Sequence, residues 1–130
     1  MQLKIIFTIN YIYAFIFGIG FVFFPTLCSS MIGFNVEGDA HLIAQAMGLF
    51  VVFSGLLPFF ARAASKSEAR RAIVLSLFIL YILLFLFKVS LNLFHGFSFN
   101  LMFAVIYVIH IGFLSCYGYF LFGKPREIES

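Results

Sequence analysis

Residues 72–94 read AIVLSLFILYILLFLFKVSLNLF, and this stretch decides the fold class. Its one charged residue is Lys88. At a rise of about 1.5 Å per residue, a helix of this length crosses the roughly 30 Å hydrocarbon core of a membrane. The run is apolar on all sides, whereas the strands of a membrane β-barrel alternate apolar and polar residues. The stretch therefore predicts a membrane-spanning α-helix.

Three further apolar runs have similar length and cover residues 3–24, 42–60 and 98–122. The connections on either side of residues 72–94 are short, so neighbouring helices should be antiparallel. We expect residues 1–130 to form a single all-α domain, an integral membrane antiparallel bundle of four transmembrane helices. Pro25 should close the first helix, and Pro58 should kink or end the second.

The composition points to the same class of protein. Hydrophobic residues make up 64% of the chain and charged residues 10%, whereas soluble domains carry about 25% charged residues. A lipid bilayer is therefore the first expected partner. The net charge of +3 is shared with many nucleic-acid-binding proteins. The basic residues cluster as membrane topology requires, however, and this argues against nucleic acid as a partner.

The distribution of Lys and Arg predicts the orientation. Seven of the eight fall on one side of the expected membrane: Lys4, Arg62, Lys66, Arg70, Arg71, Lys124 and Arg126. The first connection, residues 25–41, contains Glu37 and Asp39 but neither Lys nor Arg. Since Lys and Arg accumulate on the cytoplasmic side, both termini and the loop of residues 61–71 should be cytoplasmic, with the protein in a bacterial inner membrane.

Small residues recur at spacings that let helix backbones approach closely in lipid. They form three sets: Ala14 with Gly18, Ala44 with Gly48 and Gly55, and Gly112 with Ser115 and Gly118. We interpret these sets as packing signals without chemistry of their own.

One group of polar residues lies near the expected middle of the membrane. His110 is central in the last run, at the predicted depth of Tyr13 and Tyr81, and Tyr107 shares its helix face. A neutral imidazole donates one hydrogen bond and accepts one, so a tyrosine hydroxyl of another helix is the expected partner. Three roles stay open for His110: an interhelical hydrogen bond, which we favour, a contact with a quinone, lipid or haem, and a proton relay.

A second polar group lies nearer the outer face. Lys88, Asn92 and His95 form one helical stripe, and Gln45 has a similar depth. Lys88 should pair with Glu37 or Asp39, or else extend to the membrane surface.

These outer residues suggest two kinds of site. With Gln45 and Asn92, Lys88 could line a polar pocket for a small anion or a head group. An alternative is that His41 and His95 bind a metal, although no spacing in the sequence is diagnostic of one.

Residues 17–34 (FGIGFVFFPTLCSSMIGF) and 45–62 (QAMGLFVVFSGLLPFFAR) resemble the DoxX-like group of small four-helix membrane proteins. The matching positions are Gly18, Pro25, Gly33, Gly48, Gly55 and Ala61, and Gln45 stands where many members have arginine. The resemblance implies a four-helix fold. For some members it also implies association with membrane redox complexes, including quinone-linked thiosulfate oxidation.

The sequence contains no nucleophile–base pair, phosphate loop, His-x-x-x-His or Cys-x-x-Cys motif. The missing motifs argue against an enzyme, and no feature of the sequence requires a cofactor. We expect a polytopic membrane protein that acts as a non-catalytic accessory subunit of a larger membrane assembly, with a redox complex as the leading example. The alternatives are a homo-oligomeric binding or transport protein for a small hydrophobic or anionic ligand, and a membrane enzyme or quinone- or haem-contacting protein that uses His110.

Overall fold

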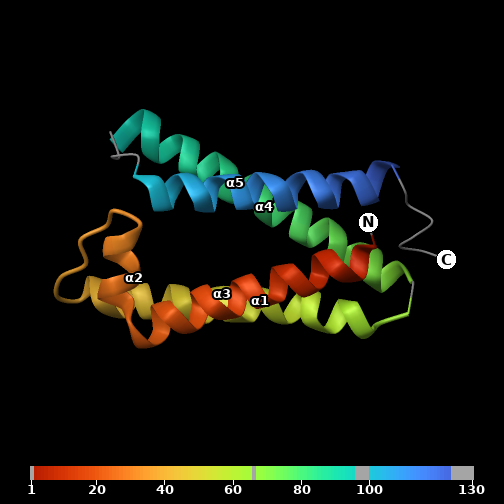
Figure 1. Ribbon diagram of the computed structural model, residues 1–130, viewed down its shortest axis with the longest axis horizontal. Coiled ribbons are helices and arrows are strands. Elements are labelled where there is room, and N and C mark those ends of the chain that lie inside the picture. Colours follow the sequence, from red (N-terminus) through yellow and green to blue (C-terminus); the bar gives the residue numbers. More distant parts are fainter. Residues whose placement is uncertain (1, 66, 96–99, 124–130) are drawn as a thin grey trace. The chain divides into compact units, whose positions relative to one another are not determined.

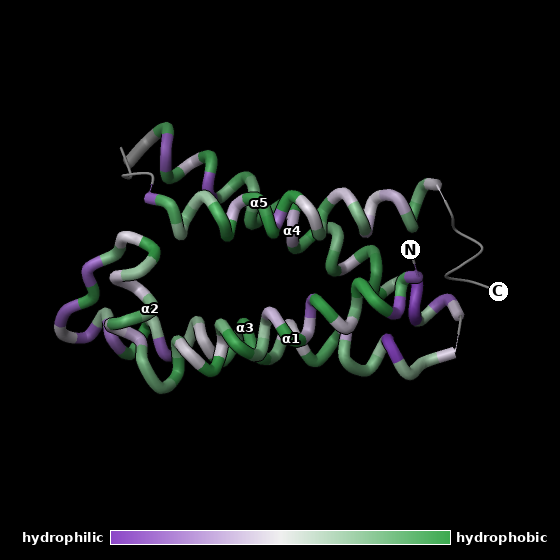
Figure 2. The backbone as a smooth tube through the Cα atoms, in the orientation of Figure 1, coloured by the Kyte–Doolittle hydropathy of each residue, from purple (hydrophilic) through white to green (hydrophobic). Residues whose placement is uncertain are grey.

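The computed structural model describes residues 2–65, 67–95 and 100–123, apart from the side chains of residues 94 and 95. Its helices are α1 (Leu3–Phe23), α2 (Pro25–Met31), α3 (Ala40–Ala63), α4 (Glu68–His95), α5 (Leu101–Gly118) and the π-helical turn η1 (Tyr119–Gly123) (Figure 1). Four helices are long and apolar enough to cross a membrane: α1, α3, α4, and α5 continued by η1. Hydrophobic residues run along all four (Figure 2). The predicted all-α membrane class with four transmembrane helices is confirmed.

The chain divides into two compact units. One comprises residues Phe7–Arg62, with most of α1, all of α2 and nearly all of α3. The other comprises Met1–Ile6 and Ala63–Ser130, with α4, α5 and η1. We call them the α1–α3 unit and the α4–α5 unit and describe each by itself. The expectation of a single domain over residues 1–130 stays a prediction.

In the α1–α3 unit, glycines bring the backbones of α1 and α3 into contact. A Cβ atom built on Gly48 would lie 2.8 Å from the carbonyl oxygen of Gly18, and one built on Gly55 would lie 2.8 Å from Cβ of Ala14. Residue numbers rise along α1 as they fall along α3, so the two helices are antiparallel. The predicted role of these small residues in helix packing is confirmed.

The connection between α1 and α3 contains a helix that the sequence did not lead us to expect. Phe24 leaves helical geometry after α1, and Pro25 then opens the seven-residue α2. Proline suits the first position of a helix because its φ is already helical and its missing N–H would have no intrahelical partner there. Gly33 and Gly38 follow with positive φ angles of 94° and 57°, a conformation that glycine adopts without strain.

With η1 counted as the continuation of α5, three helix ends differ from the sequence-based bounds by three or four residues, and the other ends differ by at most two. α3 continues past Pro58 to Ala63, so of the two predicted alternatives, a kink or a helix end at Pro58, the helix end is wrong. A proline removes one intrahelical hydrogen bond, and a helix in an apolar setting can continue beyond it. α4 begins at Glu68 instead of residue 72. α5 begins at Leu101 because the side-chain oxygen of Asn100 accepts a hydrogen bond from the N–H of Phe103, at 2.7 Å, and caps the helix.

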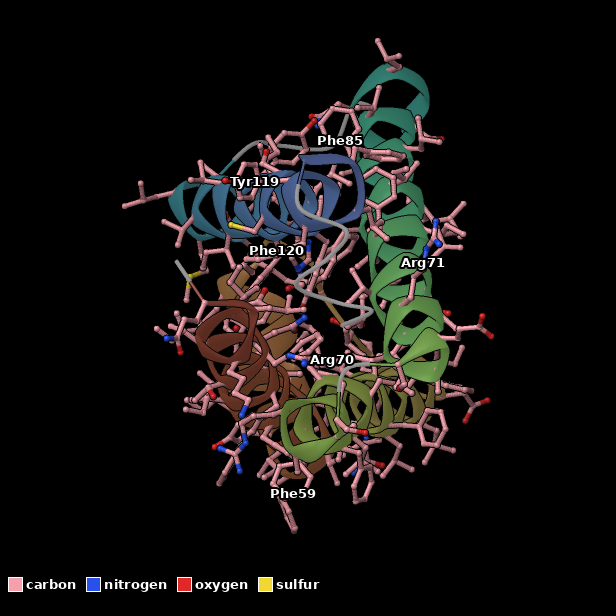
Figure 3. All side chains as sticks on the ribbon, turned by 90° about the vertical axis from the view of Figure 1, so that its right-hand side faces the viewer. Phe59, Arg70, Arg71, Phe85, Tyr119 and Phe120 are labelled. Carbon is pink, nitrogen blue, oxygen red and sulfur yellow. The ribbon has the colours of Figure 1, made fainter. Side chains whose placement is uncertain are left out.

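Aromatic rings join α4 to α5 and η1 in the α4–α5 unit. The ring centroids of Phe78 and Phe122 are 5.8 Å apart, and those of Tyr81 and Tyr117 are 6.0 Å apart. Numbers again rise along one helix as they fall along the other, so α4 and α5 are antiparallel. Phe85 of α4, which is labelled in Figure 3, pairs in a similar way with Tyr107 of α5 nearer the other end of the contact.

The small residues of α5 behave differently from one another. Gly118 packs against the ring of Phe78, and a Cβ atom added there would lie 3.1 Å from that ring. A Cβ atom added to Gly112 would meet no heavy atom within 4 Å among the described residues. Within the α4–α5 unit Gly112 therefore makes no close helix contact with the described residues, and its predicted role in helix packing stays a prediction.

Candidate functional site

A lysine and a histidine meet in the α4–α5 unit. Nζ of Lys88 on α4 lies against Nδ1 of His110 on α5. Lys88 is only 6% exposed. An ammonium group can only donate hydrogen bonds, so Nδ1 accepts and the proton of the neutral imidazole resides on Nε2. The contact therefore fixes the tautomer of His110 as long as Lys88 carries its proton.

Aromatic side chains surround this pair. The ring centroid of Tyr81 lies 5.3 Å from that of His110 and 5.3 Å from that of Phe113. Nζ of Lys88 lies 5.5 Å from the ring centroid of Tyr107, within the range of a cation–π interaction. The structure therefore brings four predicted candidates together in one unit: Tyr81, Lys88, Tyr107 and His110.

The charge of Lys88 is not balanced by a carboxylate of its own unit among the described residues. The acidic residue that the structure describes there is Glu68, at the start of α4. Twenty residues of helix separate it from Lys88, which corresponds to about 30 Å. The centre thus combines a buried amine, an imidazole and aromatic walls, and can present hydrogen-bond donors to an acceptor group.

The sequence assigned Lys88 and His110 to different depths, and this separation is wrong. Lys88 lies seven residues before the end of α4 and His110 nine residues after the start of α5. These intervals correspond to about 10 and 14 Å from the same connection, so the two residues share a level. Counting from the connection instead of from each apolar run would have revealed the pair. The predicted partner of His110 is a tyrosine hydroxyl, but the structure places the ammonium of Lys88 at its Nδ1 atom.

The side chains of Asn92 and Gln45 both donate hydrogen bonds to backbone carbonyl oxygens. Nδ2 of Asn92 donates to the carbonyl oxygen of Lys88 at 3.2 Å, within its own helix. Nε2 of Gln45 on α3 donates to the carbonyl oxygen of Val22 at 2.9 Å. Val22 lies in the last turn of α1, where carbonyl groups have no intrahelical partner. Gln45 therefore ties α3 to the end of α1.

Tyr13 belongs to the α1–α3 unit, where its ring centroid lies 4.7 Å from that of Phe17. Its expected grouping with Tyr81 and His110 stays a prediction. The same holds for the pairing of Lys88 with Glu37 or Asp39, which would also join the two units.

The suggested metal ligands lie in different units. His41 is in the first turn of α3, and His95 is the last residue of α4, with its side chain outside the described part of the chain. In the described residues, no group of three or more His, Cys, Asp or Glu side chains could hold a metal ion. The pairing of His41 with His95 stays a prediction.

A second polar contact was missed by the sequence analysis. Nη1 of Arg62, in the last turn of α3, donates to the hydroxyl oxygen of Tyr11 on α1 at 3.2 Å. The sequence could have indicated this contact. Because α1 and α3 are antiparallel, the first half of α1, which contains Tyr11, runs beside the second half of α3, which contains Arg62. Of the other basic residues on the predicted cytoplasmic side, Lys66, Lys124 and Arg126 lie outside the described residues.

No family model, curated protein or solved structure matches this chain. The resemblance to the DoxX-like group stays a prediction. Three of the residues that carry it, Gly18, Gly48 and Gly55, form the backbone contact between α1 and α3, so a packing requirement alone accounts for them.

Proposed function

We propose that this membrane protein binds an apolar molecule through a carbonyl, carboxylate or phosphate oxygen at Lys88 and His110. The observation that carries the proposal is the burial of Lys88 in an apolar helix, beside a neutral imidazole and without a described carboxylate in its own unit. Ionisable groups at membrane depth are costly and mark ligand or ion sites more often than packing does.

The donors of the pair suit such a ligand. An ammonium group has three N–H bonds, and the contact with His110 uses one. The ring of Tyr107 beside the ammonium and that of Tyr81 beside the imidazole offer apolar contact to the rest of the molecule. A quinone or an acidic lipid has this combination of an oxygen acceptor and an apolar body.

The test is native mass spectrometry of the full-length protein extracted gently from its own membrane. We expect a small bound mass on the wild type, loss of that mass in Lys88→Met, and its retention in Lys4→Met. Lys4 is an exposed lysine near the start of α1, so the control removes the same charge elsewhere. A wild type without any bound small molecule would contradict the proposal.

The same sample tests the accessory-subunit prediction. A distinct protein that accompanies the chain in fixed ratio would support membership of a larger assembly, and an absorption spectrum would reveal a haem or flavin in that partner. A homo-oligomer that carries the small mass would instead favour a binding or transport protein.

We also propose that both termini and the loop of residues 61–71 face the cytoplasm of a bacterial inner membrane, on the basis of the charge distribution. In a variant without native cysteines, a cysteine at Glu37 should react with an impermeant maleimide on intact cells. A cysteine at Ser67 should react only after the cells are opened. Labelling of position 67 from outside would reverse the orientation.

A further inference from the structure

Arg62 is oriented by aromatic side chains at the end of α3. Besides its hydrogen bond to the hydroxyl of Tyr11, its guanidinium carbon lies 5.0 Å from the ring centroid of Tyr11 and 5.4 Å from that of Phe59. The rings of Tyr11 and Phe59 meet edge to face, 5.4 Å apart. The face of an aromatic ring attracts the guanidinium electrostatically at these distances. The aromatic residues therefore restrict the plane of the guanidinium.

The bond to Tyr11 uses part of the donor capacity of Arg62. A guanidinium has five N–H bonds in a rigid planar fork, and the Tyr11 hydroxyl accepts one of them. Arg62 is half-buried. The remaining donors keep an orientation that the rings define.

The position of Arg62 matches the level of lipid head groups. α3 has 24 residues, which corresponds to about 36 Å, a few ångströms more than the roughly 30 Å hydrocarbon core. Arg62 is the second-last residue of this helix. Tyrosine commonly lies at the membrane interface, and this chain has no Trp to take that place.

We propose that Arg62, held by Tyr11 and Phe59, binds the phosphate of an anionic phospholipid in the leaflet that the charge distribution assigns to the cytoplasm. The planar fork of an arginine matches two phosphate oxygens at once, which a lysine ammonium does not. Arg62 is the one Lys or Arg of the α1–α3 unit, so the positive charge that Lys and Arg give this unit lies at the end of α3. Lys88 and His110 belong to the other unit.

The experiment compares retained lipid by native mass spectrometry after purification in mixed phosphatidylglycerol and phosphatidylcholine. We expect Arg62→Gln to weaken phosphatidylglycerol binding by about tenfold, the loss typical of a charge-assisted hydrogen-bonded contact. Arg71→Gln removes the same charge from an exposed position at the start of α4 and should change binding by less than about twofold (Figure 3). Equal losses in the two variants would show a diffuse charge effect and overturn the proposal.

Two milder variants keep the test decisive if Arg62→Gln fails to fold. Arg62→Lys keeps the charge but lacks the planar fork, and Tyr11→Phe keeps the ring but lacks the hydroxyl. Both should weaken binding by about three- to fivefold while the selectivity for phosphatidylglycerol falls. Wild-type affinity and selectivity in both variants would overturn the proposal.

Discussion

The side chains of Lys88 and His110 meet across the contact between α4 and α5, so that a buried amine and an imidazole satisfy each other between two apolar helices. The two members of this pair are not equivalent. Lys88 carries the charge and donates a hydrogen bond, which Nδ1 of the neutral His110 ring accepts. Removing one partner therefore has a different consequence from removing the other.

We predict that His110→Leu destabilises the protein more than Lys88→Met. The first substitution leaves a buried ammonium without its acceptor, and a buried donor left unsatisfied costs about 1–3 kcal/mol. The second removes the charge itself and leaves a neutral ring, so the free energy of unfolding should change by less than about 1 kcal/mol. Reversible unfolding in mixed detergent micelles measures both values.

The double variant completes a double-mutant cycle for His110 and Lys88. If the loss in His110→Leu arises from the buried Lys88 ammonium that has lost its acceptor, then His110→Leu combined with Lys88→Met should be close in stability to Lys88→Met alone. Additive losses would mean that the two side chains do not act as a pair.

Gln45 provides a second prediction. Its amide donates to the carbonyl oxygen of Val22, near the end of α1. Gln45→Leu should lower the free energy of unfolding by about 0.5–1.5 kcal/mol, because this carbonyl loses its donor. Asn92→Leu is the matched control, since Asn92 donates to the carbonyl of Lys88 within its own helix. A larger loss in Asn92→Leu than in Gln45→Leu would contradict this assignment.

Cys28 on α2 leads to a prediction about pH. Burial raises the pKa of its thiol above the ordinary value, so less thiolate is present at a given pH. Alkylation by iodoacetamide near pH 8 should therefore be about two- to fivefold slower than for an exposed thiol, and the difference should shrink as the pH rises through the raised pKa.

The control is a cysteine at Ser30, an exposed position on the same short helix, in a variant with Cys28→Ser. Cys116→Ser should be present in both proteins so that one thiol is followed. Identical pH profiles for the two positions would show that the surroundings of Cys28 do not affect its ionisation.

The helices could be predicted because their signal is local. Each apolar run is close to the length of about 20 residues needed to cross a membrane, and that property does not depend on neighbouring segments. The helix ends were less accurate. The start of α5 depends on the cap that Asn100 provides. Pro25 favours the first turn of a helix and opens α2, whereas the sequence-based prediction used it only as the end of the preceding helix.

The residues of the candidate site could be predicted from their chemistry, but the contacts between them could not. Lys88 and His110 were both recognised as costly groups in lipid, which follows from chemistry alone. Their contact depends on the register between two helices, which in turn depends on where α5 begins. The bond from Gln45 to Val22 likewise requires α1 to end where it does, and no residue-level property of Gln45 predicts that.

Glycine spacing illustrates the same limit and gives a last prediction. Gly48 and Gly112 both belong to predicted packing sets, but the backbone of α1 approaches Gly48, whereas in the α4–α5 unit no described heavy atom of another helix lies within 4 Å of a Cβ atom built on Gly112. In Gly48→Ala the new methyl would meet the carbonyl oxygen of Gly18 at 2.8 Å and the nitrogen of Val22 at 2.9 Å. The helices must then separate, so we expect a loss of about 2 kcal/mol or more, against about 0.5 kcal/mol or less for Gly112→Ala. Thermal unfolding of the two variants beside the wild type measures both, and equal effects would mean that α1 and α3 do not meet at Gly48.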